Sequence, residues 1–300
     1  MKKIEEYIDN VYKLVKTSEE LNLNKKCIIT GGFCANSYFS PHFRRYSNDI
    51  DFLVSKEEIS KDFNGPLKHE SGVEFYYKKV GENLYIFLIV NKDTKNYPLE
   101  EIGTFNEYFS EKGSKFLGRR LKEHEILETK MKSMISRFRG AEAIKDAYDI
   151  SLLVNYMDGE VVKEVIEQLE DNNIPKIASY IISMKKFKDS IKRKIQPLIV
   201  SGEFPEKIYD SSVEKLEKFA KGYRPEEVIV SSVIFSLSRK ENREILGKIG
   251  VRSDRTKDVI KVLDEKLSEI DIAKKNKFAE EIIQYGKKAV IKMLYEIFEI

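Results

Sequence analysis

The chain has 300 residues, of which 41% are hydrophobic and 34% are charged, and its formal net charge at pH 7 is +3. This composition excludes a disordered chain and suits a helix-rich globular protein, and there is no apolar run of about 18 residues that would predict a membrane span. The small positive charge does not by itself establish nucleic-acid binding. Because the cysteines and histidines have no zinc-binding spacing, we expect Cys27 and Cys34 to be buried, reduced thiols in a cytoplasmic protein.

The N-terminal part of the chain carries the strand signals. The first residues place apolar side chains at helical spacing and lack the continuous apolar core of a signal peptide. Helices are predicted at 2–16, 33–39 and 56–62. Strands are predicted at 27–30, 49–54, 73–80 and 84–90. The last two strands form a hairpin through a glycine-containing turn. The alternation predicts a small α/β domain with helices packed on a mixed sheet.

From residue 123 onward the pattern is almost entirely helical. Amphipathic segments separated by glycine, proline and polar breaks predict successive helices. They lie at 123–138, 141–156, 161–171, 174–200, 211–221, 225–238, 239–248, 254–269 and 272–298. The sequence therefore predicts an α+β protein whose C-terminal half is helical.

Two aspartates stand at the start of the predicted strand 49–54. Asp49 and Asp51 are separated by a single residue, so their side chains point the same way on a strand while Ile50 points into the core. Two adjacent carboxylates repel one another, and a divalent cation relieves that repulsion best. The turn Gly31-Gly32 closes the preceding strand. A glycine turn beside a metal-binding carboxylate pair is what phosphate chemistry on a nucleotide requires.

A second group of charged residues lies on the first two predicted helices of the C-terminal half. Lys130 and Arg137 share a face of one helix, and Asp146 and Asp149 share a face of the next. The two helices are joined by a two-residue break, so they can fold back on each other as a hairpin beside the sheet, with the cationic face against the acidic one. Lys132 is an alternative to Lys130, and the spacing to Arg137 favours Lys130.

Together these stretches resemble the nucleotidyltransferases of the AbiEii/AbiGii toxin family, which belong to the DNA polymerase β-like superfamily. The family pattern is a GG turn, a helix and an Arg-x-Ser-x-Asp-[Ile/Leu]-Asp run, then a helical lysine followed by an arginine, then Arg/Lys-Asp-x-Tyr/Phe-Asp-[Leu/Ile]. The matching residues are Gly31, Gly32, Arg45, Ser47, Asp49, Asp51, Lys130, Ser133, Arg137, Lys145, Asp146, Tyr148 and Asp149. The resemblance covers about residues 25 to 153.

The resemblance implies a polymerase β-like nucleotidyltransferase domain at 1–122 and a helical domain at 123–300, whose first two helices complete the active site. It implies that Asp49 and Asp51 bind Mg²⁺, which bridges the nucleotide phosphates. The glycine turn, with Ser37 just beyond it, would approach the triphosphate. Arg45 would contact phosphate or the acceptor.

The same resemblance gives roles to the helical residues. Lys130 would neutralise phosphate charge, and Asp146 would orient Lys130 or act on the incoming hydroxyl. Asp149 would contribute to nucleotide binding or support Arg137 or Lys145 structurally. The further nucleotide-binding candidates are Ser47, Arg137 and Lys145.

One departure from the superfamily pattern concerns the third carboxylate. Polymerase β-like enzymes commonly carry it on a later strand, and the predicted strand 84–90 has none. Glu74 on the preceding strand is a weak substitute. Either the site works with two strand carboxylates and Asp146, which we favour, or catalysis is impaired.

Two clusters of basic residues provide the argument for an RNA partner. A basic helix face binds the phosphate backbone without reading sequence, although a solvated helix face explains such a run equally well. The clusters are Lys185, Lys186, Lys188, Lys192, Arg193 and Lys194, and Lys115, Arg119, Arg120 and Lys122. Neither cluster has interleaved aromatic residues, so base stacking is not indicated there. His42 is expected to be an exposed loop residue.

The sequence and the resemblance together predict a Mg²⁺-dependent nucleotidyltransferase that transfers NMP from an NTP to an acceptor. The resemblance makes the 3′ end of tRNA the leading acceptor and a toxin–antitoxin system, with a cognate antitoxin protein, the leading context. Two alternatives stay open: a small-molecule nucleotidyltransferase of the aminoglycoside-modifying kind, and a degenerate domain that binds a nucleotide or partner without turnover.

Overall fold

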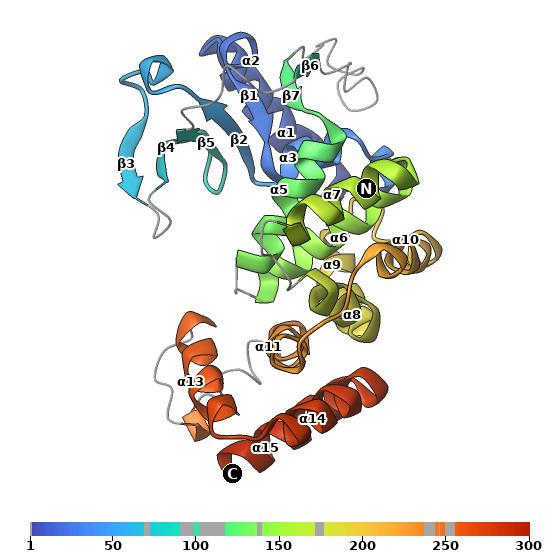
Figure 1. Ribbon diagram of the computed structural model, residues 1–300. Coiled ribbons are helices and arrows are strands. Elements are labelled where there is room, and N and C mark those ends of the chain that lie inside the picture. The colour runs from blue at the N-terminus through green and yellow to red at the C-terminus, as the bar shows by residue number, and fades with distance from the viewer. Residues whose placement is uncertain are drawn as a thin grey trace. The chain divides into compact units, whose positions relative to one another are not determined.

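The computed structural model describes residues 2–68, 73–90, 99–101, 118–136, 140–171, 177–236, 244–245, 247–249 and 256–300 (Figure 1). It confirms the predicted α+β class, with a mixed sheet followed by a helical C-terminal half. Of the helices that it describes, none is long and apolar enough to cross a membrane.

The chain divides into two compact units. The first comprises Met1–Thr129 and Leu198–Phe204, and the second comprises Lys130–Pro197 and Pro205–Ile300. The division falls within α5 (Glu123–Ser136), just after the boundary predicted from the sequence at residue 122. Residues 198–204 belong to the first unit because they form hydrogen bonds with it. Tyr46 N donates to Leu198 O at 2.7 Å, and Val200 N donates to Arg44 O at 2.8 Å.

The sheet of the first unit has seven strands in the order β3-β4-β5-β2-β1-β7-β6. They are β1 (Ile28–Thr30), β2 (Asp49–Val54), β3 (Asn64–Lys68), β4 (Glu74–Lys79), β5 (Tyr85–Val90), β6 (Leu99–Glu101) and β7 (Arg119–Leu121). β2 lies between β1, to which it is antiparallel, and β5, to which it is parallel. The predicted β4–β5 hairpin is present as an antiparallel pair. The sequence patterns did not predict β3, β6 or β7.

One face of the sheet is buried at its centre, on β2 and β5. Its side chains on β2 and β5 include Ile50, Phe52, Ile86 and Leu88, each 0% exposed. α1 (Lys2–Glu20) contacts β5, and α3 (Gly31–Ser37) contacts β1 and β2. α1 buries a stripe at helical spacing that consists of Tyr7, Val11, Leu14 and Val15. Strand alternation therefore leaves Asp49 and Asp51 on the opposite face, where both keep partial exposure.

The second unit is entirely helical among its described residues. Beyond α5 its helices are α6 (Gly140–Tyr156), α7 (Gly159–Asp171), α8 (Ile177–Lys186), α9 (Lys188–Ile195), α10 (Glu206–Phe219), α11 (Pro225–Ser236), α13 (Thr256–Ser268), α14 (Ile272–Tyr285) and α15 (Lys287–Phe298). α6 packs on α10, and α11 packs on α8 and α14. Large aromatic side chains fill this core, with Tyr148, Tyr209 and Phe235 all 0% exposed.

Three helix predictions were wrong for local reasons. The predicted helix 56–62 is a single 3₁₀ turn, because Ser55 and Glu58 form a capping box around only Lys56–Glu58. The predicted helix 272–298 breaks at Gly286, whose φ is +62°. The predicted helix 174–200 breaks at buried Phe187, between α8 and α9. Most of the predicted helix 239–248 lies outside the described residues.

The two cysteines are buried and free, as expected. Burial is the main reason that the pKa of the Cys27 thiol is raised to about 12. Both thiols are buried, unlike the accessible thiol of a reactive cysteine, so their contribution is to packing.

Candidate active site

Asp49 and Asp51 occupy the partly exposed face of β2. Ser47 Oγ donates a hydrogen bond to Asp49 Oδ1 at 2.8 Å, and Ser47 itself is 6% exposed. The hydroxyl therefore orients the first carboxylate from the turn that precedes the strand. Asp51 pairs in register with Thr30, the last residue of β1. This places the second carboxylate beside the point where the chain turns from β1 into α3.

Gly31 permits this close approach. Its φ is +68°, and a Cβ atom built there would lie 2.0 Å from Asp51 Oδ2. No side chain other than hydrogen fits between the turn and the carboxylate. At Gly32 a Cβ atom would lie 2.6 Å from a terminal guanidinium nitrogen of Arg45. The glycine turn is thus bounded by Asp51 on one side and by the Arg45 guanidinium on the other.

Arg45 is held firmly in this place. Asn36 Nδ2 donates to Arg45 O at 2.8 Å, and Arg45 N donates to Asn36 Oδ1 at 3.3 Å. Arg45 also forms an antiparallel bridge with Ile199 of the returning segment. These contacts hold the main chain of Arg45, and the residue is only 5% exposed, so its guanidinium is a largely buried positive charge beside the turn.

Alanine at Gly31 is expected to abolish the geometry of the carboxylate pair. Gly202 offers a matched control, because its φ is +76° and a Cβ atom added there would meet nothing within 4 Å. Gly202→Ala should cost about 1–2 kcal/mol from the left-handed backbone alone. Gly31→Ala should cost more and should also displace Asp51. Thermal unfolding of both variants, with Mg²⁺ titration, measures the difference; equal losses of stability would contradict it.

Ser37 lies away from the glycine turn. It stands at the C-terminal end of α3, seven residues long, whereas Gly31 begins that helix. Ser37 Oγ donates to Cys34 O at 2.6 Å and accepts from Arg120 Nη1 at 2.7 Å. The Arg120 guanidinium in turn stacks over the Tyr38 ring at 3.5 Å. These contacts tie α3 to β7, and they give Ser37 a structural role in the first unit.

The predicted helical residues form a buried ion triad in the second unit. Lys130 Nζ lies 2.8 Å from Asp146 Oδ1 and 2.8 Å from Asp149 Oδ2. The three side chains are 6%, 3% and 0% exposed. Lys130 projects from α5 toward successive turns of α6, so it meets the acidic face that Asp146 and Asp149 form. Among the described atoms, Asp146 Oδ2 is buried without a hydrogen-bond partner.

The other helical candidates lie outside this triad or outside the described residues. Lys132, the alternative to Lys130, is exposed. Lys145 immediately precedes Asp146 on α6 and is partly exposed, so the helix turns it away from the Asp146–Asp149 face. Arg137 lies outside the described residues.

The strand register settles where a third strand carboxylate would have to stand. Tyr85 of β5 pairs with Asp49, and Phe87 pairs with Asp51. Aromatic rings therefore occupy those positions. Glu74 is excluded as a substitute: alternation on β4 places it on the face opposite Phe75 and Tyr77, which pair with the Asp51 side of β5. Its carboxylate instead binds Lys56 at 3.2 Å.

The donor set suits a magnesium ion. Mg²⁺ typically keeps several waters and is bound by one or two carboxylates together with substrate phosphates. Asp49 and Asp51, on one partly exposed face, supply such a pair. No cluster of three or more acidic, histidine or cysteine side chains that could hold a metal occurs within the described part of the chain.

The basic clusters are largely engaged with protein groups. Lys185 binds Glu217 at 2.6 Å, Lys188 binds Asp210 at 2.7 Å, and Lys192 binds Glu206. Acidic residues of α10 thus neutralise much of the α8–α9 run. In the second cluster, Arg119 Nη2 donates to Lys25 O at 2.8 Å, and Lys115 lies outside the described residues. Among the described residues of the two clusters, these pairings give little support to a phosphate-binding track.

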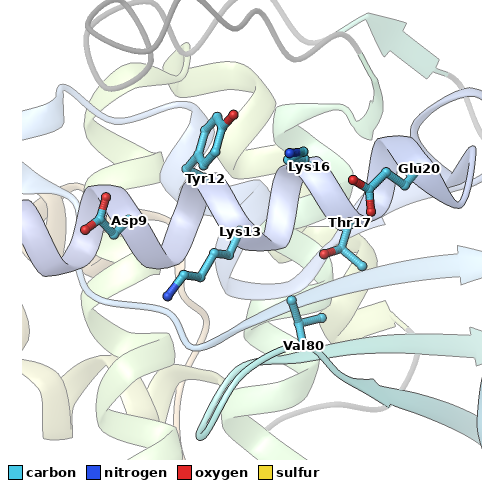
Figure 2. Close-up of a pocket in the computed structure, with 7 residues that line it drawn as sticks. All are labelled: Asp9, Tyr12, Lys13, Lys16, Thr17, Glu20 and Val80. Atoms are coloured by element: carbon cyan, nitrogen blue, oxygen red, sulfur yellow. The ribbon is translucent and has the colours of Figure 1, made fainter.

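Two further surface features do not include the carboxylate pair. His42 is exposed, as expected, and is 3.3 Å from Glu203. Figure 2 shows the residues that line a hollow along α1. It is lined by Asp9, Tyr12, Lys13, Lys16, Thr17, Glu20 and Val80. This hollow contains none of the residues that the sequence predicted for the site.

The fold and the site define an α+β protein in which a glycine turn, a buried arginine and two partly exposed aspartates meet on one face of the sheet. Comparisons of the chain with protein-family models, curated proteins and solved structures find no match.

Proposed function

We propose that this protein is a Mg²⁺-dependent nucleotidyltransferase that transfers NMP from an NTP to an acceptor and releases pyrophosphate. The observation that carries the proposal is the contact of the Asp51 carboxylate with Gly31, beside Asp49. A negatively charged triphosphate approaches a carboxylate pair only when a divalent cation lies between them. Because glycine has no side chain, the backbone of the turn can also come close to the triphosphate.

Each candidate residue of the first unit would have its own role in the transfer. Asp49 and Asp51 would hold the ion, with Ser47 fixing the orientation of Asp49. When bound, Mg²⁺ would bridge phosphate oxygens and neutralise the charge that develops during transfer. The Arg45 guanidinium would bind the pyrophosphate side of the NTP, because it is a positive charge that borders Gly32.

The acceptor and biological context follow from the family resemblance. The acceptor would be the 3′ end of tRNA. The protein would be the toxin component of a toxin–antitoxin system, with a cognate antitoxin as its partner. A small-molecule nucleotidyltransferase remains the second candidate, and a non-catalytic nucleotide-binding or partner-binding domain is the third. Aromatic residues in place of a third strand carboxylate favour the non-catalytic alternative.

Incubation of the protein with labelled NTPs, Mg²⁺ and total RNA tests the proposal. We expect label in an RNA fraction, and chelation of Mg²⁺ should remove it. Absence of transfer to any RNA would exclude the tRNA acceptor. Transfer to an aminoglycoside added in place of the RNA would establish the second candidate. Growth inhibition upon expression that persists after loss of both Asp49 and Asp51 would show that inhibition does not require catalysis.

A further inference from the structure

An aromatic cluster lies on the same sheet face as the aspartate pair. Register and alternation place Phe75 and Tyr77 of β4, and Tyr85 and Phe87 of β5, on this face. The Tyr85 and Phe87 rings are stacked with centroids 5.9 Å apart, and the Phe75–Phe87, Tyr77–Tyr85 and Tyr77–Phe87 centroids are 6.4, 6.4 and 6.5 Å apart. We call these four rings the aromatic face.

The aromatic face differs from the core of the same strands. Ile86 and Leu88, on the other side of β5, are 0% exposed, whereas all four rings keep partial exposure. Partly exposed aromatic rings on a sheet are a common surface on which nucleobases stack, because every base has a π-face. Lys79 pairs with Tyr85 and is exposed at the edge of this face, where it can meet a phosphodiester.

The order of the strands determines on which side of Asp49 and Asp51 the aromatic face lies. β2 lies between β1 and β5. Gly31 and Arg45, the groups suited to the leaving pyrophosphate, are on the β1 side, and the rings are on the β5 side. In phosphoryl transfer the attacking and leaving oxygens are roughly in line across phosphorus. The attacking acceptor therefore approaches from the aromatic side.

We propose that the aromatic face binds the terminal base of a single-stranded RNA acceptor and so positions its hydroxyl for attack. The assignment to the acceptor, as opposed to the NTP base, rests on the proposed nucleotidyl transfer. The chemistry of the face also separates acceptor classes. Four rings and an exposed lysine suit a base and a phosphodiester, whereas a cationic aminoglycoside would require carboxylates at these positions.

Binding of RNA without NTP tests the proposal separately from catalysis. The probe is a short single-stranded RNA with a 5′ fluorophore, compared with the same RNA whose 3′-terminal nucleotide is abasic. Loss of the base, or the change Tyr77→Leu in the protein, should weaken binding about tenfold, because the base and the ring would no longer stack on each other. Tyr77→Phe, which keeps the ring, should bind like the wild type.

Tyr76→Leu is the matched control, because Tyr76 neighbours Tyr77 on β4 but points to the opposite face, against Gly65. Equal effects of Tyr76→Leu and Tyr77→Leu, or no effect of the abasic end, would overturn the proposal. Weakened binding of free NTP with unchanged binding of RNA would also overturn it, by assigning the rings to the NTP base. A protein that binds RNA as described yet transfers no label would contradict only the proposed function.

Discussion

Replacing Asp51 with asparagine is expected to lower nucleotidyl transfer by about a thousandfold while leaving the protein folded. A metal contributes several kcal/mol to stabilisation of transition-state charge, and each 1.36 kcal/mol corresponds to about a factor of ten in rate. The change removes one of two adjacent carboxylates on a partly exposed face. It also relieves their repulsion, so stability without metal should be unchanged or slightly higher. Transfer of labelled NMP to RNA measures the first effect.

The change in melting temperature upon addition of Mg²⁺ is a second measurement of metal binding by the aspartate pair, and it does not require activity. Added Mg²⁺ should stabilise the wild type, because binding to the folded state alone raises its stability, and it should not stabilise Asp51→Asn. Glu74→Gln is the matched control, since Glu74 is a carboxylate of the same sheet on the opposite face. An equal response of both variants to Mg²⁺ would show that the aspartate pair does not bind the ion.

Replacing Lys130 with methionine is expected to destabilise the protein by about 3–5 kcal/mol, because removal of one partner from a buried ion pair leaves uncompensated charge in the interior. Here two carboxylates lose their shared cation, since Asp146 and Asp149 both lie 2.8 Å from Lys130 Nζ. Methionine keeps the length and apolar volume of the lysine stem, so the loss reports mainly on charge. Chemical and thermal unfolding measure it.

Lys132→Met supplies the control on the same helix. Lys132 is exposed, and an exposed substitution of this kind changes stability by about 0.5 kcal/mol or less. The triple variant Lys130→Met/Asp146→Asn/Asp149→Asn should recover much of the stability lost in Lys130→Met, because it removes the buried charges together. A Lys130→Met protein as stable as the wild type would refute the structural importance of the triad.

The triad also changes how activity data on Lys130 should be interpreted. A loss of transfer in Lys130→Met alone would follow either from an unfolded second unit or from a missing cation at the phosphates. The triple variant separates these explanations if it folds. Restored stability without restored transfer would assign the residues a part in the chemistry, whereas restored transfer would limit them to joining α5 to α6.

Local sequence patterns determined the elements that depend on near neighbours. The alternation of Asp49, Ile50 and Asp51 predicted a strand with two carboxylates on one face, and β2 has those bounds. Helical spacing likewise predicted that Asp146 and Asp149 share a face, because the helix period alone decides this. The fold class followed from the change from strand to helix periodicity along the chain.

The tertiary structure determined which of these strand and helix faces lie next to one another. β2 pairs with β5 and not with the next strand in sequence, so Tyr85 and Phe87 stand where a third carboxylate was sought. The alternating aromatics at 75, 77, 85 and 87 were visible in the sequence, but only the register shows that they share the face of Asp51. The helix breaks at Phe187 and Gly286 were missed because they depend on backbone angles and on packing.

The glycine turn illustrates the division best. Its presence before a strand bearing two aspartates was evident from the sequence and indicated phosphate chemistry. That Gly31 contacts Asp51, that Gly32 contacts Arg45, and that Ile199 returns to hold Arg45 all depend on segments far apart along the chain. Residue type and spacing specify the chemistry available, whereas long-range strand pairing and close packing fix which groups act together.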